Sequence, residues 1–180
     1  MSNTVSIILA GFGGQGILFA GKFLAYKGLL EDKKLSWLPS YGPEMRGGTA
    51  NCSVTISSEE IYSPIVVKAS TVIAMNRPSL EKFENDVLPG GNLFINSSIV
   101  DIKSTRTDIN VYYVPCNEIA HDLGNQKVSN MVMLGAYLEK CPYVKVDSVL
   151  QALLEKLGEK KAHLLTVNRD AFEKGAAALK

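Results

Sequence analysis

The chain has 180 residues, of which 46% are hydrophobic and 21% are charged, a composition typical of one folded domain with a sizeable core. Nineteen basic and eighteen acidic residues leave a formal net charge of +1, so the cationic excess typical of nucleic-acid-binding proteins is missing. No apolar run approaches the roughly 18 residues of a membrane span, and no basic leader opens the chain. We therefore expect a single cytoplasmic domain over residues 1–180 that binds neither nucleic acid nor membrane.

The first two thirds of the chain alternate between strand and helix patterns. Strands are predicted at residues 5–10, 35–38, 50–56, 71–75, 92–96 and 111–114, and helices at 15–27 and 78–87. The strand at 50–56 is expected to pair with residues 61–62 through a turn at 57–60. These patterns predict a three-layer α/β fold, Rossmann-like, with a mixed, mostly parallel sheet and helices on both faces.

The last third is predicted to be helical. Ser129, Asp147 and Asn168 are candidate caps for three helices, of which the first ends near Glu139 and the third runs to the end of the chain. The middle helix is predicted to end near Leu157. Its apolar residues recur every three or four positions, a stripe that favours core packing over partner binding: Val146, Val149, Leu150, Leu153, Leu154 and Leu157.

A glycine loop separates the first predicted strand from the first helix. It reads Gly11-Phe12-Gly13-Gly14-Gln15-Gly16, which has the spacing G-x-G-x-x-G. In this context the motif indicates either phosphate or dinucleotide binding, or only a tight strand-to-helix turn. A nicotinamide cofactor would also need an acid at the end of the second strand. Glu31 and Asp32 precede that strand instead, so nicotinamide binding is disfavoured.

A second loop spans residues 39–52 and reads P-S-Y-G-P-E-M-R-G-G-T-A-N-C. Its glycines permit unusual backbone angles, and its prolines stiffen the entry. Glu44 and Arg46 supply charges of both signs, and a forked guanidinium suits phosphate or carboxylate. The loop is predicted to contact a ligand or partner, with a solvated turn holding a Glu44–Arg46 ion pair as the alternative.

No catalytic residue set is recognisable. His121 is expected at an exposed helix end and His163 in a polar turn, and no catalytic motif appears. Cys52, Cys116 and Cys141 are too widely spaced for a disulfide framework, zinc site or iron–sulfur site within this chain. We expect reduced, mostly buried thiols, with Cys52 as an apolar filler and, as the less favoured alternative, a reactive thiol beside the second loop.

Four stretches together resemble the γ subunit, or γ domain, of the 2-oxoacid:acceptor (ferredoxin) oxidoreductases. They are residues 10–17 and 40–48, which contain the two loops, the strand end Ile73-Ala74-Met75-Asn76, and the helix start at residues 129–136. The resemblance implies that Gly11, Gly13, Gly14, Gln15 and Gly16 bind a cofactor. It also implies that Ser40, Tyr41, Glu44, Arg46, Gly47, Gly48, Asn76 and Asn130 contact a ligand or partner.

Such complexes convert a 2-oxoacid and CoA to acyl-CoA and CO₂ while reducing ferredoxin. The resemblance implies that partner subunits hold the thiamine diphosphate, Mg²⁺ and 4Fe–4S clusters, that CoA is a co-substrate, and that this chain is inactive alone. Pyruvate, 2-oxoglutarate, branched-chain 2-oxoacids and indolepyruvate stay open as substrates, with a preference for 2-oxoglutarate or a branched-chain 2-oxoacid. The alternatives are a free-standing NAD- or FAD-dependent oxidoreductase and a regulatory binding module.

Overall fold

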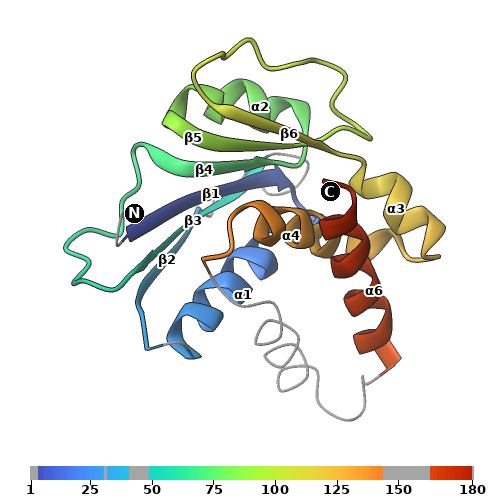
Figure 1. Ribbon diagram of the computed structural model, residues 1–180, viewed down its shortest axis with the longest axis horizontal. Helices are drawn as coiled ribbons and strands as arrows, with labels where there is room; N and C mark the ends of the chain where they lie inside the picture. Colours follow the sequence, from blue (N-terminus) through green and yellow to red (C-terminus); the bar gives the residue numbers. More distant parts are fainter. Residues whose placement is uncertain (1–3, 31, 41–48, 144–162, 180) are drawn as a thin grey trace.

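Six strands form one sheet in the order β2-β3-β1-β4-β5-β6, with helices on both faces (Figure 1). This computed structural model describes residues 4–30, 32–40, 49–143 and 163–179. The strands are β1 (Thr4–Phe12), β2 (Lys34–Ser40), β3 (Thr49–Ser57), β4 (Ala69–Ala74), β5 (Val87–Asn96) and β6 (Asn110–Val114). The helices are α1 (Ile17–Leu30), α2 (Arg77–Phe83), α3 (Cys116–Asp122), α4 (Ser129–Lys140) and α6 (His163–Ala177), with short 3₁₀ helices η2 (Glu84–Asp86) and η3 (Gln126–Val128).

The predicted mixed, mostly parallel sheet is confirmed. β1, β4, β5 and β6 are parallel neighbours, and only β3 runs the other way, between β1 and β2. The expected pairing of residues 50–56 with 61–62 is wrong, because β3 pairs with β1 and β2 and residues 61–62 are not in a strand. The β1 and β2 ladders run along nearly the whole of β3, whereas residues 61–62 form only a short run, and Pro64 after it has no N–H to donate to a ladder.

Several predicted helix boundaries shift for local reasons. α1 begins at Ile17 rather than at residue 15, because Gly14 and Gly16 have φ values of +95° and +73° that no α-helix accommodates. Ser129 lies inside α4 and does not cap it; Val128 occupies the cap position. α6 begins at His163, so this residue starts a helix instead of lying in a turn, and Asn168 is an interior residue. The helix predicted at 147–157 lies outside the described residues.

Two hydrophobic clusters lie on opposite faces of the sheet. The larger one joins α1, α3, α4 and α6 to side chains such as Leu9 and Val54, and we call this side the α1 face. The smaller one joins α2 to Ile8, Val72 and Leu93, and we call this side the α2 face. Residues 7, 8 and 9 of β1 therefore point alternately to the two faces, as a buried strand requires. Figure 1 shows α2 above the sheet and α1, α4 and α6 below it.

Helices α4 and α6 cross at two glycines. A Cβ atom built on Gly135 would lie 1.9 Å from the backbone oxygen of Phe172, and one built on Gly175 would lie 1.9 Å from that of Val132. The two helix backbones are thus in direct contact, because the glycine of each helix leaves room for the backbone of the other. This crossing fixes α4, which carries one of the predicted site residues.

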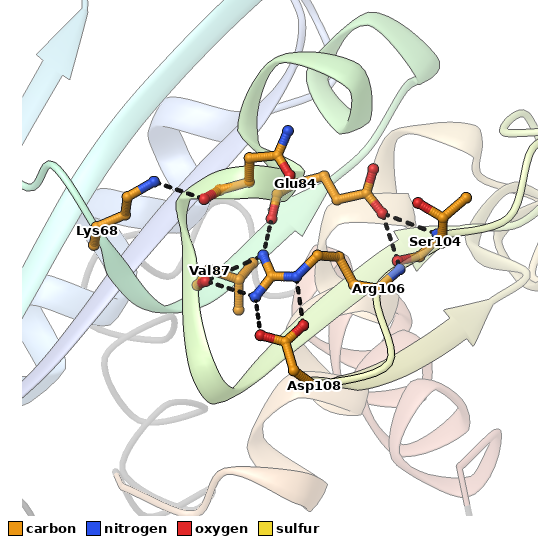
Figure 2. A network of polar contacts seen from close by, with 8 residues as sticks. Lys68, Glu84, Val87, Ser104, Arg106 and Asp108 are labelled. Atoms are coloured by element: carbon orange, nitrogen blue, oxygen red, sulfur yellow. Dashed lines mark hydrogen bonds and ion pairs between the residues drawn. The ribbon is translucent and has the colours of Figure 1, made fainter.

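On the α2 face, one arginine fastens the segment between β5 and β6 (Figure 2). The Arg106 guanidinium donates to both carboxylate oxygens of Asp108 at 2.6 Å, to the Glu84 carbonyl at 3.2 Å and to the Val87 carbonyl at 3.3 Å. The Ser104 hydroxyl donates to the Glu84 carboxylate at 2.5 Å. Hydrogen bonding by Arg106 lowers the pKa of Asp108. These contacts hold residues 104–108 against η2 and the start of β5.

Candidate functional site at the carboxyl edge of the sheet

The carboxyl ends of β1 and β4 lie where an open α/β sheet usually binds its ligand. The two strands are parallel neighbours, but the chain leaves β1 toward α1 on one face and leaves β4 toward α2 on the other. Loops that diverge in this way leave a crevice between them. The glycine loop follows β1 and Asn76 follows β4, so the structure brings these two predicted site elements to the same edge.

Gln15 joins the two loops. Its side-chain oxygen accepts from the Phe12 backbone N–H at 2.6 Å, and its side-chain nitrogen donates to the Met75 carbonyl at 3.2 Å. Gly11 makes room for this arrangement, because a Cβ atom there would lie 2.5 Å from the Gln15 oxygen. Both ends of the Gln15 amide are therefore engaged within the chain. Its direct role is to hold the loop against the end of β4.

Asn130 supports the same loop from α4. Its side-chain nitrogen donates to the Gly16 carbonyl at 3.3 Å, a contact between residues 114 positions apart. The Gly16 carbonyl also accepts from the Ala20 N–H at 2.9 Å, which starts α1. A Cβ atom at Gly16 would lie 2.5 Å from the Asn130 amide. The loop thus ends in a glycine because a neighbouring helix occupies the space of a side chain.

Gly13 and Gly14 form the exposed tip of the loop. Both are exposed, and a Cβ atom on Gly14 would meet nothing within 4 Å. With the Gln15 and Asn130 amides engaged, the groups this tip offers to a ligand are its backbone N–H groups and the beginning of α1. Such groups suit an anion.

Asn76 serves its own helix. Its side-chain oxygen accepts from the Ser79 N–H at 2.9 Å and so caps α2, and the residue is 1% exposed. Its side-chain nitrogen and the Ser79 hydroxyl are buried without a hydrogen-bond partner among the described residues. The geometry accounts for Asn76 as a capping residue. Its predicted ligand contact stays a prediction.

Asn96, at the end of β5, is a polar residue of this edge that the sequence interpretation missed. It is fully buried, its nitrogen donates to the Asn117 side-chain oxygen at 2.8 Å, and its oxygen accepts from the Ser98 N–H at 3.3 Å. Ser98 and Asn117 line an open hollow of about 420 Å³ with His121. The available signal was an asparagine that ends a strand and precedes two serines, the same kind of position as Asn76.

The second loop begins and ends at this edge. Ser40 is exposed at the end of β2 and pairs with Asn51, which pairs in turn with Ala10. Thr49, where the chain returns, pairs with Phe12. The predicted residues of the loop itself lie outside the described residues: Tyr41, Glu44, Arg46, Gly47 and Gly48. Their roles stay predictions, but the end of the segment at Thr49 adjoins the glycine loop at Phe12.

The thiols are free and poorly suited to nucleophilic chemistry. Burial raises the pKa of Cys52 to about 12 and that of Cys141 to about 11, and it raises the pKa of Cys116 as well. This confirms Cys52 as a buried filler, and its thiol lies 3.7 Å from the Ile17 carbonyl. His121 is exposed at the end of α3. Within the described ranges no three His, Cys, Asp or Glu side chains gather to hold a metal ion.

Comparison with known proteins identifies the family. The family model described as pyruvate ferredoxin/flavodoxin oxidoreductase matches residues 6–178. The chain belongs to this family. The 2-oxoglutarate synthase subunit KorC of Methanocaldococcus jannaschii is 34% identical over 94% of this chain and 90% of its own length. The ketoisovalerate oxidoreductase subunit VorA of Methanothermobacter marburgensis is 40% identical over 74% of this chain, but that match spans only 28% of VorA.

Solved structures show the same two forms of this oxidoreductase family. The γ subunit of a keto/oxoacid ferredoxin oxidoreductase from Geobacter sulfurreducens aligns with a TM-score of 0.82 and 27% identity, over 97% of this chain and 98% of that one. A 2-oxoglutarate:ferredoxin oxidoreductase from Magnetococcus marinus, with coenzyme A bound, aligns with a TM-score of 0.90 and 25% identity, over 99% of this chain and 31% of that one. The family unit thus occurs both as a separate subunit and as part of a longer chain. No described helix of this chain is long and apolar enough to cross a membrane.

Proposed function

We propose that this chain forms one γ domain and acts as the γ subunit of a cytoplasmic 2-oxoacid:ferredoxin oxidoreductase complex. The complex would convert a 2-oxoacid and CoA to acyl-CoA and CO₂ and reduce ferredoxin. The observation that carries the proposal is the match along nearly the whole length of both chains to KorC and to the Geobacter γ subunit. A free-standing enzyme would need a catalytic residue set, and the described residues bring none together at the carboxyl edge.

Thiamine diphosphate, Mg²⁺ and the 4Fe–4S clusters belong, in this proposal, to partner subunits. When bound there, they would supply the decarboxylation and electron-transfer chemistry. The residues described here do not fit these groups, since the three cysteines are separate and no acidic cluster suited to a metal is formed by the described part of the chain. The contribution of this chain is to position loops beside a site completed by other chains.

The glycine loop is the part of this chain proposed to meet the CoA phosphates. Its tip presents backbone N–H groups at the start of the 14-residue helix α1, where an anion is favoured by the free donors and the helix dipole. Gln15 and Asn130 would act as positioning residues, because their amides are bound to the Met75 and Gly16 carbonyls. The bound coenzyme A in the Magnetococcus relative supports a CoA-related role for this fold.

Two substrates are favoured by the names of the relatives. KorC is named for 2-oxoglutarate and VorA for ketoisovalerate, and both are over 30% identical to this chain. We propose one of these two 2-oxoacids as the substrate. The side chains that read the substrate would lie mainly in partner chains, because the described edge of this domain carries small and amide residues rather than a charged pocket.

The test is to purify the tagged chain anaerobically with its co-expressed partner subunits. The eluate would be assayed for iron, thiamine diphosphate and CoA-dependent reduction of ferredoxin with 2-oxoglutarate, ketoisovalerate and pyruvate. We expect an iron-containing complex whose kcat/KM is highest for one of the first two. A lone chain that binds NAD or FAD would support the nucleotide-dependent alternative, and partner binding without any effect on turnover would support a regulatory module.

A charge reversal tests the second loop in the same complex. Arg46→Glu should weaken assembly or raise the KM for CoA at least tenfold, because a fixed cation that faces phosphate or a partner carboxylate would become a repelling anion. Lys174→Glu, on the exposed side of α6, makes the same charge change elsewhere and should have no effect. Normal assembly and an unchanged KM in the Arg46 variant would refute the predicted contact.

A further inference from the structure

The α2 face of the sheet carries helix α2 on its β1–β4 side but has an uncharged, partly exposed surface over β2 and β3. Strand register defines this surface, because Leu35, Trp37, Cys52 and Val54 face α1 and every second residue therefore faces away from α1. The outward residues pair across the two strands as Lys34 with Ser57, Ser36 with Thr55, Leu38 with Ser53, and Ser40 with Asn51. Thr55 and Ser57 are buried, and Lys34 marks a charged end of this side. We call the six residues of the last three pairs the open face.

The open face has an unusual composition for a surface in water. None of its six residues is charged, although the chain as a whole is 21% charged. Leu38, in its middle, is 42% exposed. Solvent-facing strands normally carry charged side chains that resist edge pairing and keep the surface soluble, whereas the centres of protein interfaces are depleted in charge. The composition is that of an interface centre.

An exposed apolar segment adjoins the open face. In the connection between β3 and β4, Tyr62 is 96% exposed, Ile65 68% and Val67 72%. These residues line a hollow of about 280 Å³ together with Ser6 and Thr55, so the segment borders the open face. Three large side chains exposed within six residues form an apolar patch of the kind that can mark a protein-binding site.

Charged residues lie at one end of this apolar and hydroxyl surface. Lys34, at the start of β2, pairs with Glu60 at 3.2 Å, and Lys68 pairs with Asp86 at 3.1 Å. Lys34, Glu60 and Lys68 are well exposed, and Asp86 is partly exposed. A neutral centre with a charged rim is the usual arrangement of a protein–protein contact.

We propose that the open face and the segment around Tyr62 form the surface on which this γ subunit binds a partner chain of the oxidoreductase. This proposal rests on the proposed function. The occupant is a polypeptide with an uncharged, aliphatic and hydrogen-bonding surface that corresponds to the remainder of the longer relatives. This domain accounts for only 28% of VorA and 31% of the Magnetococcus chain, so most of each longer chain lies outside this domain and is available to cover the surface.

The size of the surface sets what the partner must contact. Two strands of about five positions each, at roughly 3.3 Å per residue and 4.8 Å per strand, give an area of about 160 Å². A stable interface buries about 800 Å² per partner. The open face is therefore a centre only, and the contact must extend over the segment around Tyr62. Substitutions at the centre should weaken binding most, because binding energy is concentrated there.

The experiment measures binding of the purified chain to the remaining subunits of the complex, purified without it. Leu38→Arg and Ser53→Arg place a cation in the middle of the open face, and Ala177→Arg makes the same change at the exposed end of α6. Circular dichroism and thermal melts establish that each variant is folded. We expect both open-face variants to bind at least tenfold more weakly than the wild type and the Ala177 variant to bind within twofold of it.

Three other outcomes would distinguish the surface assignment from the proposed function. Open-face variants that are folded and bind as tightly as the wild type would overturn the surface assignment while leaving the proposed function intact. A homodimer of the wild-type chain that the same variants dissociate, with partner binding unchanged, would assign the open face to a second copy and overturn the proposal. A wild-type chain that binds no partner subunit would refute the proposed function, and the surface assignment with it.

Discussion

Gly135→Ala places a methyl group in the crossing of α4 and α6, where it should destabilise the protein although alanine is the better helix former. The new Cβ atom would lie 1.9 Å from the Phe172 carbonyl oxygen, while real Cβ atoms essentially never come within 3.0 Å of another heavy atom. The helices would have to separate by about 1 Å to relieve this contact. The obstacle is backbone, so no side-chain rotation can relieve it.

The net effect follows from two opposing terms. Glycine to alanine inside a helix gains about 1 kcal/mol of helix propensity. Overpacking costs about 1–3 kcal/mol, and a rigid backbone obstacle favours the upper end. The expected net loss is about 2 kcal/mol, which for a chain of this size lowers the melting temperature by about 4–8 °C. The displaced α4 would also loosen the contact between Asn130 and Gly16.

Thermal unfolding followed by circular dichroism measures this effect, with Lys174→Ala on the exposed side of α6 as the control. The control should stay within about 0.5 kcal/mol of the wild type. Gly175→Ala should behave like Gly135→Ala, and the double variant should cost less than the sum, because the first separation already makes room for the second methyl group. An unchanged or raised melting temperature for Gly135→Ala would refute the close backbone contact.

Three further predictions concern the glycine loop, the stability of the protein at low pH and the thiols. Gln15→Ala removes the hydrogen bonds to Phe12 and Met75, so it should lower the free energy of unfolding by about 1–3 kcal/mol. It should also raise the KM for CoA more than it lowers kcat. An unchanged KM would show that the loop does not meet CoA. Arg106 lowers the pKa of Asp108, so the stability this carboxylate contributes is present above the unfolded pKa of about 3.9 and is lost as the pH falls through the lower folded value. The melting temperature should therefore fall in that acidic window, and should fall less steeply in Asp108→Asn; equal slopes in both proteins would contradict the Arg106 interaction. Burial raises the pKa of Cys52 to about 12, so a thiol reagent at pH 8 should label Cys52 only after unfolding, as mass spectrometry of digested protein would show, and rapid labelling of the folded chain would contradict its burial.

The sheet was largely predictable from sequence because its strands carry strong local patterns. The run at residues 5–10 and the run at 71–75 are buried from both faces, and such strands read as continuous apolar segments. The position of β3 was not predictable in the same way. Its alternation indicates one buried face, but alternation does not say which neighbours provide the partners, and one of the two partners, β1, lies far away in sequence.

The candidate site was predictable in its position and not in its internal bonds. The glycine spacing and the strand-end asparagine correctly indicated one edge of the sheet. The contact of Asn130 with Gly16 depends on how α4 packs, which is decided by the Gly135 and Gly175 crossing rather than by any motif near Asn130. Asn96 was missed because a single asparagine after an apolar run is a common sequence feature, and only its burial makes it notable.

The engaged amides at the carboxyl edge limit what this domain can recognise. The side-chain nitrogens of Gln15, Asn96 and Asn130 donate to backbone or to another amide. The Asn76 oxygen caps α2 while its nitrogen is buried, so backbone N–H groups are the exposed donors of the glycine loop. Backbone donors bind an anion without reading the rest of the molecule. Such a site suits a group shared by all members of the family, such as the phosphates of CoA, and is poorly suited to distinguish one 2-oxoacid from another. This is consistent with one fold serving relatives named for 2-oxoglutarate and for ketoisovalerate, and it agrees with the proposal that partner chains discriminate between substrates.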